Sequence, residues 1–246
     1  MKKLYSLIAL FTISATMVLN AQNRIVQIMK DGNVLQSYPV EQIDSIIIVE
    51  EFTPEFTPEA VDLGLSVKWA SCNVGATSPE EYGGYYAWGE TEEKDDYAWP
   101  IYKWCNGGDR SMTKYCADSS WGTVDNKTVL DPEDDVAHVK WGGSWRMPTS
   151  DEIKELLNKC SLQWTEVNGI KGQKVTGPNG NSIFLPAAGA WSGTVYDGHG
   201  SEGRYWSGTL YDGSKYAYYL SFGGAGNFLG RFSDRCTGLS VRPVTE

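Results

Sequence analysis

Several stretches of the chain alternate apolar and polar side chains with a period of two, which is the pattern of strands that bury one face. Residues 172–176 and 182–187 flank a Gly-Pro-Asn-Gly sequence and predict a hairpin. Other strands are predicted at 67–70, 85–88, 205–207, 216–222, 228–232 and 239–244. Residues 90–135 have acidic clusters and few apolar runs, which predicts a long insertion with little regular structure. We therefore expect a mainly antiparallel sheet.

A short amphipathic helix is predicted to begin directly after Thr149. Glu152 follows Thr149 at the spacing of a capping box, in which each side chain accepts a hydrogen bond from the other residue's backbone N–H. The apolar residues of one helix face then follow at helical spacing: Ile153, Leu156, Leu157 and Cys160. The cap and the periodicity thus agree on where the helix starts.

In the segment before this helix, residues 141–149, residues 144–147 are predicted to be extended and to lead directly into the helix. Gly142 and Gly143 end the preceding element, and Pro148 disfavours the helical region for the residue before it. At this corner we expect Trp145 to be buried and Arg146 to hydrogen-bond to nearby carbonyl groups.

The first 21 residues have the pattern of a secretory signal peptide. Lys2 and Lys3 precede an apolar run over residues 4–19, and Ala21 offers a small residue for cleavage. A membrane anchor is disfavoured because the run is shorter than the roughly 20 apolar residues that span a bilayer. No cysteine lies near the cleavage site for lipid attachment. We expect an exported protein, secreted, periplasmic or at the cell surface, with no transmembrane segment after signal removal.

The remaining chain is predicted to have three parts. Residues 22–50 alternate around an Asp-Gly-Asn turn and predict a small β-hairpin segment. Residues 51–60 repeat a proline-containing tetrapeptide, which favours an extended linker. Residues 61–246 are rich in aromatic residues and glycine and form the main domain.

Charge and cysteine content narrow the function and the chemistry. The formal net charge is -10, and removal of Lys2 and Lys3 would bring it to about -12, which disfavours a nucleic-acid partner. The five cysteines are an odd number, so at least one is unpaired or pairs between molecules. Cys105 and Cys116 flank a short loop and are the first candidates for a disulfide. Two free thiols are the alternative.

Several motifs in order give the chain a resemblance to a known family. The motifs VDLGLSVKWASCNVGA, YYAWGE, GTVDNKTVLDPEDDVAHVKWGGSWRMPT, NGIKGQKVTGPNGNSIFLPAAG, YWSGT and GLSVRPV resemble the Fibrobacter succinogenes major paralogous domain, a family of exported bacterial proteins. The match covers about residues 61–246. Residues 22–50 are similar to a module of exported proteins from Bacteroidetes-type bacteria.

This resemblance implies an α+β domain of C-type-lectin-like fold, related to the sulfatase-modifying factors and to the variable proteins of diversity-generating retroelements. The implied domain has a mainly antiparallel sheet, one or two short helices, and chain ends that meet in a sheet. Trp145, Arg146, Pro148 and Thr149 match the strand-to-helix corner that defines this fold. In the retroelement relatives the ligand face lies near the carboxy-terminal part, which by location implies Tyr196, Tyr211, Phe228 and Arg231 as ligand-binding residues.

Acidic residues near position 131 are the candidates for a metal site. Asp131, Asp134 and Asp135 offer oxygen ligands to calcium, but calcium needs six to eight convergent oxygens. The stronger alternative is a helix start with Asp131 as the N-cap, Pro132 in the first position and acids in the first turn. We therefore expect no cofactor, with calcium as the alternative.

Catalysis is not expected from the sequence. Formylglycine-generating enzymes share the implied fold and use a reactive cysteine pair with copper, but no second cysteine adjoins Cys236. His138 and His199 are the only side chains with an ordinary pKa near neutrality, and neither has an evident orienting partner.

Binding is the favoured class of function. Residues 196–235 contain many of the side chains that dominate interaction hot spots, and we expect about half of these to form the core instead. They are Tyr196, Arg204, Tyr205, Trp206, Tyr211, Tyr216, Tyr218, Tyr219, Phe228, Arg231 and Arg235. The sequence predicts a non-catalytic recognition domain for a glycan or a surface protein. The alternatives are an enzyme on the formylglycine-generating scaffold and a structural subunit of a surface assembly that docks through residues 23–50.

Overall fold

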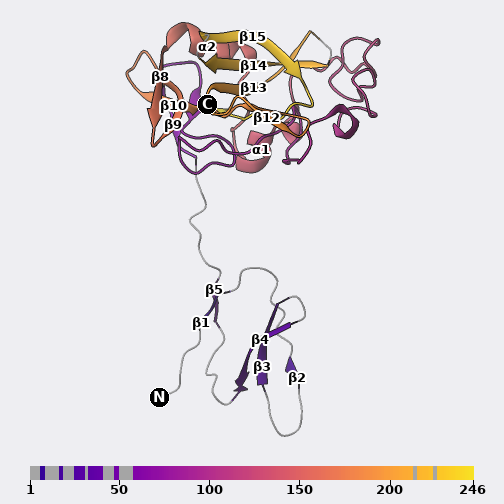
Figure 1. Ribbon diagram of the computed structural model, residues 1–246, viewed down its shortest axis with the longest axis vertical. Coiled ribbons are helices and arrows are strands. Elements are labelled where there is room, and N and C mark those ends of the chain that lie inside the picture. The colour runs from indigo at the N-terminus through magenta and orange to yellow at the C-terminus, as the bar shows by residue number, and fades with distance from the viewer. Residues whose placement is uncertain are drawn as a thin grey trace. The chain divides into compact units, whose positions relative to one another are not determined.

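The computed structural model describes residues 6–8, 17–18, 25–30, 33–40, 47–49, 58–212, 215–223 and 226–246. The chain divides into two compact units, residues 1–56 and 57–246 (Figure 1). This division falls inside the predicted linker, residues 51–60, and β6 begins at its last residue, Ala60.

The amino-terminal unit consists of short strands. They are β1 (Ser6–Ile8), β2 (Met17–Val18), β3 (Ile25–Lys30), β4 (Asn33–Pro39) and β5 (Ile47–Val49). β3 and β4 pair antiparallel on either side of the predicted turn, which confirms the hairpin, and β1 pairs with β5 in parallel. β1 and β2 lie within the predicted signal peptide, which stays a prediction.

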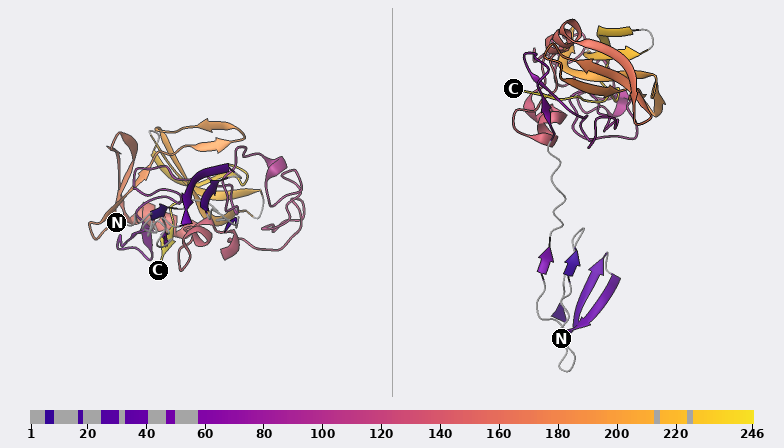
Figure 2. Two further views of the ribbon diagram at one scale, coloured as in Figure 1. Left: turned by 90° about the horizontal axis from the view of Figure 1, so that it is seen from below. Right: turned by 90° about the vertical axis from the view of Figure 1, so that its left-hand side faces the viewer.

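The second unit contains most of the strands, arranged in small antiparallel sheets (Figures 1 and 2). Three sheets have three strands each. The first contains β6 (Ala60–Val61), β7 (Lys68–Ala70) and β16 (Val244–Thr245), and the second contains β8 (Ser161–Val167), β9 (Ile170–Thr176) and β10 (Ser182–Pro186). The third contains β13 (Glu202–Tyr211), β14 (Tyr216–Gly223) and β15 (Gly226–Asp234). A fourth sheet pairs β11 (Ala190–Ser192) with β12 (Val195–Asp197). The predicted strand at 85–88 is present only as a single bridge between Tyr86 and Leu239.

Two α-helices and two short 3-10 helices complete this unit: η2 (Trp99–Ile101), η3 (Pro132–Asp134), α1 (Val136–Trp141) and α2 (Ser150–Lys159). The architecture is therefore α+β with mainly antiparallel pairing, as predicted. The insertion at 90–135 has no strand or α-helix of its own, which also confirms the prediction.

The ends of the second unit meet in one sheet. β16 pairs antiparallel with β7, and Val244 also bridges to Arg146 in the segment that leads into α2. Because β7 is the central strand of the order β16-β7-β6, the first and last strands of the unit flank it on opposite sides.

The helix α2 starts as predicted. The Thr149 hydroxyl accepts a hydrogen bond from the Glu152 backbone N–H at 3.2 Å, and the Thr149 N–H donates to the Glu152 carboxylate at 2.7 Å. Ile153 and Leu156 on its apolar face are fully buried. The capping box therefore fixes both the start of the helix and the face that it turns to the core.

The corner before α2 differs from the prediction in two respects. Trp145 is only partly buried, because its ring packs edge-on against Trp141 at the end of α1 and not in the core. Arg146 donates to one carbonyl, that of Met147, but its two strongest bonds go to the Glu152 carboxylate at 2.6 and 2.8 Å. The guanidinium thus ties the corner to the first turn of α2.

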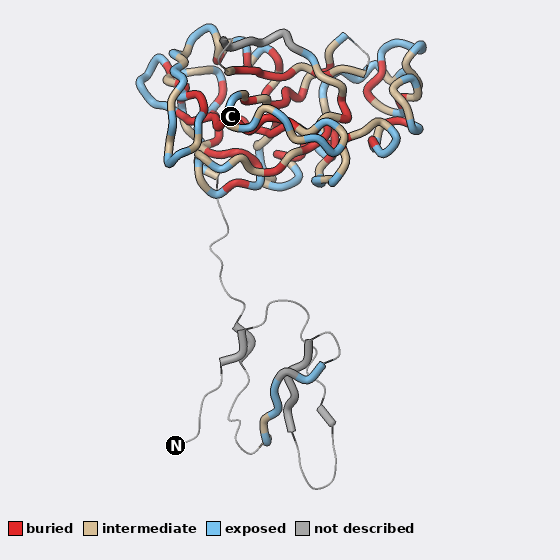
Figure 3. The backbone as a smooth tube through the Cα atoms, viewed as in Figure 1, coloured by how far each residue is buried: buried red, intermediate tan, exposed pale blue. Residues whose placement is uncertain are grey.

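The core of the second unit runs through the middle of the sheets (Figure 3). Trp69, Trp88 and Trp206 are its largest apolar side chains and are at most 1% exposed. Arg235 and Arg242 are equally buried. Arg235 therefore belongs to the part of the 196–235 aromatic and arginine set that forms the core, and its guanidinium lies among the Trp88, Tyr102 and Tyr115 rings.

Glu155 on α2 gives the fold a defined acid sensitivity. The Lys159 ammonium at 2.7 Å and hydrogen bonds from Ser66 lower the pKa of Glu155 to about 2, from an ordinary value of 4.5. A depressed folded-state pKa stabilises the protein above pH 4.5, and this contribution is lost as the pH falls towards 2. We expect the melting temperature of Glu155→Gln to fall less over this range than that of the wild type. Glu166→Gln, at an exposed position on β8, should behave like the wild type.

Candidate functional site

One of the predicted ligand-binding residues, Tyr211, belongs to a cluster of aromatic rings on the sheet β13-β14-β15. Tyr211 pairs with Tyr216 across β13 and β14, and Tyr218 pairs with Phe232 across β14 and β15, so all four side chains point to the same face. We call these four residues the tyrosine face.

The rings of the tyrosine face pack closely on one another. Tyr211 stacks on Phe232 with ring centroids 4.4 Å apart and 19° between the planes, and Tyr218 meets Tyr211 edge-on at 4.9 Å. Tyr216 lies 4.8 Å from Phe232. Phe232 is 44% exposed and the tyrosines are partly buried. An aromatic cluster is thus accessible at the surface.

Tyr196 lies elsewhere, on β12. Its ring is stacked between Trp191 at 4.9 Å and the exposed His199 at 4.8 Å. Its hydroxyl donates to the Ala188 carbonyl at 3.0 Å and shares a 2.6 Å hydrogen bond with the Tyr85 hydroxyl. Burial raises the pKa of Tyr196. The structure therefore separates Tyr196 from Tyr211 and gives it partners within the fold.

The other two predicted binding residues, Phe228 and Arg231, lie on β15. In the register of the sheet Phe228 pairs with Ser221 and Arg231 pairs with Tyr219. Their side chains lie outside the described residues. Phe228 and Arg231 thus lie on the same strand as Phe232 of the tyrosine face.

Two of the three acidic residues predicted for calcium, Asp131 and Asp134, lie in a group that already contains the Lys114 ammonium ion. Ligand atoms of Asp131, Glu133 and Asp134 lie within 4.8 Å of one another. The Lys114 Nζ atom lies 2.6 Å from both Asp131 and Asp134, and 3.7 Å from Glu133. Calcium would have to displace Lys114 from these oxygens.

Asp135 does not join that group, because its carboxylate caps α1. It accepts hydrogen bonds from the backbone N–H groups of Ala137 at 2.9 Å, His138 at 3.4 Å and Met147 at 2.7 Å. The predicted helix start at Asp131 is present in the 3-10 helix η3, which has Asp131 as its N-cap residue, Pro132 in its first turn and Glu133 and Asp134 after it, although the Asp131 side chain makes no capping hydrogen bond. Asp135 joins α1 to the strand-to-helix corner.

The predicted disulfide between Cys105 and Cys116 is wrong, since all five cysteines are free thiols. The two sulfur atoms take part in different local hydrogen bonds: Cys105 donates to the Trp99 carbonyl at 3.2 Å, and Cys116 donates to the Asp118 carbonyl at 3.1 Å. After Cys105 the backbone turns back, so that Cys105 bridges to Met112, and the Met112 N–H donates to the carbonyl of Trp121 beyond Cys116.

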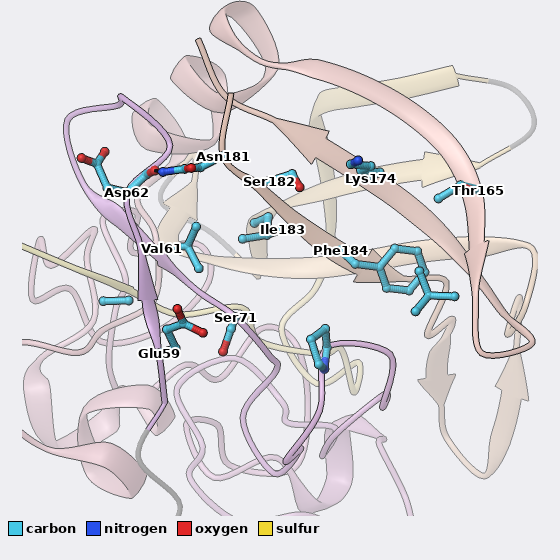
Figure 4. A pocket seen from close by; sticks show the side chains of 13 residues that line it. Glu59, Val61, Asp62, Ser71, Thr165, Lys174, Asn181, Ser182, Ile183 and Phe184 are labelled. Carbon is cyan, nitrogen blue, oxygen red and sulfur yellow. Dashed lines mark hydrogen bonds between the residues drawn. The ribbon is translucent and has the colours of Figure 1, made fainter. Parts of the chain in front are cut away.

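A cleft of about 640 Å³ was not predicted from the sequence. It lies between β6 and the sheet of β8, β9 and β10 (Figure 4). Apolar side chains line its interior, and charged side chains stand at its edges. The apolar side chains are Val61, Pro79, Val167, Ile183 and Phe184, and the charged side chains are Glu59, Asp62 and Lys174.

Hydrogen bonds between side chains and backbone hold the two walls of this cleft together. Asn179 and Asn181 donate to the Asp62 carbonyl at 2.9 and 2.8 Å, and Asn181 and Asp62 are labelled in Figure 4. Asn168, in the β8–β9 turn, donates to Glu80 at 2.6 Å. The turn before β10 is thus tied to the end of β6, and the turn before β9 is tied to Glu80 in the segment after β7.

No family model, curated protein or solved structure matches this chain. Inferences about function therefore rest on the residues and their arrangement. In the part of the chain that the structure describes, no helix is both long enough and apolar enough to cross a bilayer.

Proposed function

We propose that this chain is an exported, non-catalytic recognition domain of C-type-lectin-like fold in the Fibrobacter succinogenes major paralogous family, and that it binds a surface or extracellular protein. The ordered sequence motifs support the family assignment. The pairing of β16 with both β7 and the corner before α2 is the arrangement expected for that fold.

The tyrosine face is the observation that carries the binding proposal. Tyrosine is enriched in hot spots because it combines a large, rigid contact area with a hydroxyl group that hydrogen-bonds. Three of the four residues are tyrosines, and they gather on one face with the exposed Phe232. A cluster of this kind at the surface is typical of an interaction site.

The packing of these rings favours a protein over a glycan as the ligand. Sugars stack on open ring faces, but the facing sides of Tyr211 and Phe232 are occupied by each other. The ring edges and phenol hydroxyls of the cluster suit the mixed polar and apolar surface of a protein.

The proposal is tested by screening the full chain against arrays of extracellular proteins and of glycans. We expect a protein ligand whose affinity falls at least tenfold, or about 1.4 kcal/mol, in Tyr211→Ala and in Phe232→Ala. Trp164→Ala is the matched control, because Trp164 is an exposed aromatic residue on β8, 40% accessible, outside the tyrosine face. If all three variants bound the ligand equally well, the binding site would lie outside the tyrosine face. If the chain bound a glycan and Tyr211→Ala abolished that binding, the ligand would be a glycan and not a protein.

The enzymatic alternative receives little support from the candidate cysteine. Burial raises the pKa of the Cys236 thiol to about 12, so the reactive thiolate is scarce at neutral pH. The alternative of a structural subunit docking through residues 23–50 is supported only by the β3–β4 hairpin.

A further inference from the structure

Two strands that border the cleft are the edges of their sheets. β6 is the outer strand of the order β16-β7-β6, and β10 is the outer strand of the order β10-β9-β8. An edge strand presents backbone N–H and C=O groups that another strand can pair with. The direction in which these groups point follows from the hydrogen bonds within each sheet.

On β6 the free groups belong to Ala60. The Ser71 N–H donates to the Glu59 carbonyl at 2.9 Å, so residue 59 faces β7. Because backbone groups alternate along a strand, Ala60 directs its N–H and C=O away from β7. Asp62 has the same orientation, and its carbonyl accepts the two asparagine side chains from the turn before β10.

On β10 the groups that point away from β9 belong to Ser182 and Phe184. Residues 177 and 181 and residues 171 and 187 form hydrogen-bonded pairs, which fixes the alternation between β9 and β10. Ser182 and Phe184 therefore direct their N–H and C=O groups away from β9. The Phe184 carbonyl confirms this, since it accepts a bond from the Arg242 guanidinium at 2.9 Å.

The asparagine bonds show that the two edges face each other. The Asn179 and Asn181 amides donate to the β6 edge at Asp62, as the backbone of an added strand would. Beyond that point the cleft opens, and among the described residues no hydrogen bond reaches the outward groups of Ala60 or Ser182. Both residues are exposed.

We propose that this cleft binds an extended peptide segment of a partner protein by β-strand addition to β6 and β10. The backbone of the segment pairs with Ala60 and Ser182, and alternate side chains enter the apolar interior formed by Val61, Ile183 and Phe184. Its volume of about 640 Å³ lies within the range of ligand sites. This site is separate from the tyrosine face and does not depend on it.

Charge favours a basic residue in the segment. Glu59 and Asp62 flank the β6 side of the cleft, and Lys174 lies on the opposite wall (Figure 4). The lining has two acidic side chains and one basic side chain, so a lysine or arginine next to β6 complements it.

The test uses the full chain and fluorescent hexapeptides of alternating valine and threonine that carry one lysine at each position in turn. We expect some of them to bind, and glutamate in place of the lysine to weaken binding at least tenfold. N-methylation of either alternate set of backbone nitrogens should weaken binding at least tenfold as well, because one set faces β6 and the other faces β10. No bound hexapeptide, or binding that tolerates N-methylation of either set, overturns the proposal.

A protein variant tests the same contact from the other side. Ala60→Pro removes an N–H that makes no hydrogen bond within the fold, and should weaken peptide binding at least tenfold, whereas Ala60→Val should not. Peptide binding should also slow hydrogen exchange at Ala60 and Ser182 in the unmodified chain, which does not depend on how the proline variant folds. Tyr211→Ala should leave peptide affinity unchanged, and a loss there would contradict a separate site.

Discussion

Replacing Arg235 with methionine will lower the free energy of unfolding by about 3–5 kcal/mol, a large share of the total for a domain of this size. Its guanidinium donates to the Tyr102 hydroxyl at 2.9 Å and to the carbonyls of Lys114 and Tyr115 at 3.0 Å. Methionine fills similar space but leaves these acceptors without a donor, at about 1–3 kcal/mol each. Removing the buried charge also removes its desolvation cost, so the net loss of stability is smaller than the sum of the costs of three unsatisfied acceptors.

The loss should be concentrated in one part of the chain, because all these partners lie in the insertion at 90–135. Urea unfolding measures the free energy, and limited proteolysis under native conditions should reveal new cleavage between residues 99 and 131. Arg204→Met is the control, since Arg204 is partly exposed and pairs only with Glu202 at the surface, where such pairs contribute about 0–1 kcal/mol. Similar losses in the two variants would contradict the anchoring role of Arg235.

Replacing Arg242 with methionine is expected to cost about 2–4 kcal/mol for a related reason. This guanidinium donates to the Ala70 carbonyl at 3.0 Å, the Asn73 side chain at 2.8 Å and the Phe184 carbonyl at 2.9 Å. It therefore links β7 to β10. Burial lowers the pKa of Arg242, which shows how strongly the site disfavours an unpartnered charge.

Hydrogen exchange distinguishes this effect from a general loss of stability. Amides of β9 and β10 should exchange faster in Arg242→Met under conditions where those of β13 and β14 do not. Lys171→Met, at an exposed position on β9, should leave both sets unchanged. If amide exchange became faster to the same extent in all sheets, Arg242 would not act specifically on the link between β7 and β10.

Local signals in the sequence were sufficient for the elements that local interactions determine. The start of α2 follows from Thr149 and Glu152, three residues apart, and the β9–β10 hairpin follows from its turn. The strand β8 was not predicted, although Leu162 and Trp164 alternate within it, because it directly follows a helix and lacks a turn signal before it.

The candidate sites show where sequence reasoning stops. Tyr211 could be predicted as an accessible aromatic residue, but its stacking on Phe232 depends on strand register. Arginine is ordinarily exposed, so the burial of Arg235 could not be expected without knowing that residues 114 and 115 lie beside it. The cleft between β6 and β10 is lined by residues about 120 positions apart in the sequence, so no local sequence pattern could predict it.

The pairing of β16 with β7 also determines when the second unit can fold. β16 and both buried arginines lie within residues 235–245, while their partners are spread from residue 68 to residue 184. A growing chain that ends before residue 235 therefore lacks a flanking strand of one sheet and two central hydrogen-bond donors of the core. Completion of the fold has to wait until this last segment is available, and contacts between such distant residues form slowly. For a protein exported as we propose, this delay would keep the chain unfolded while it crosses the membrane.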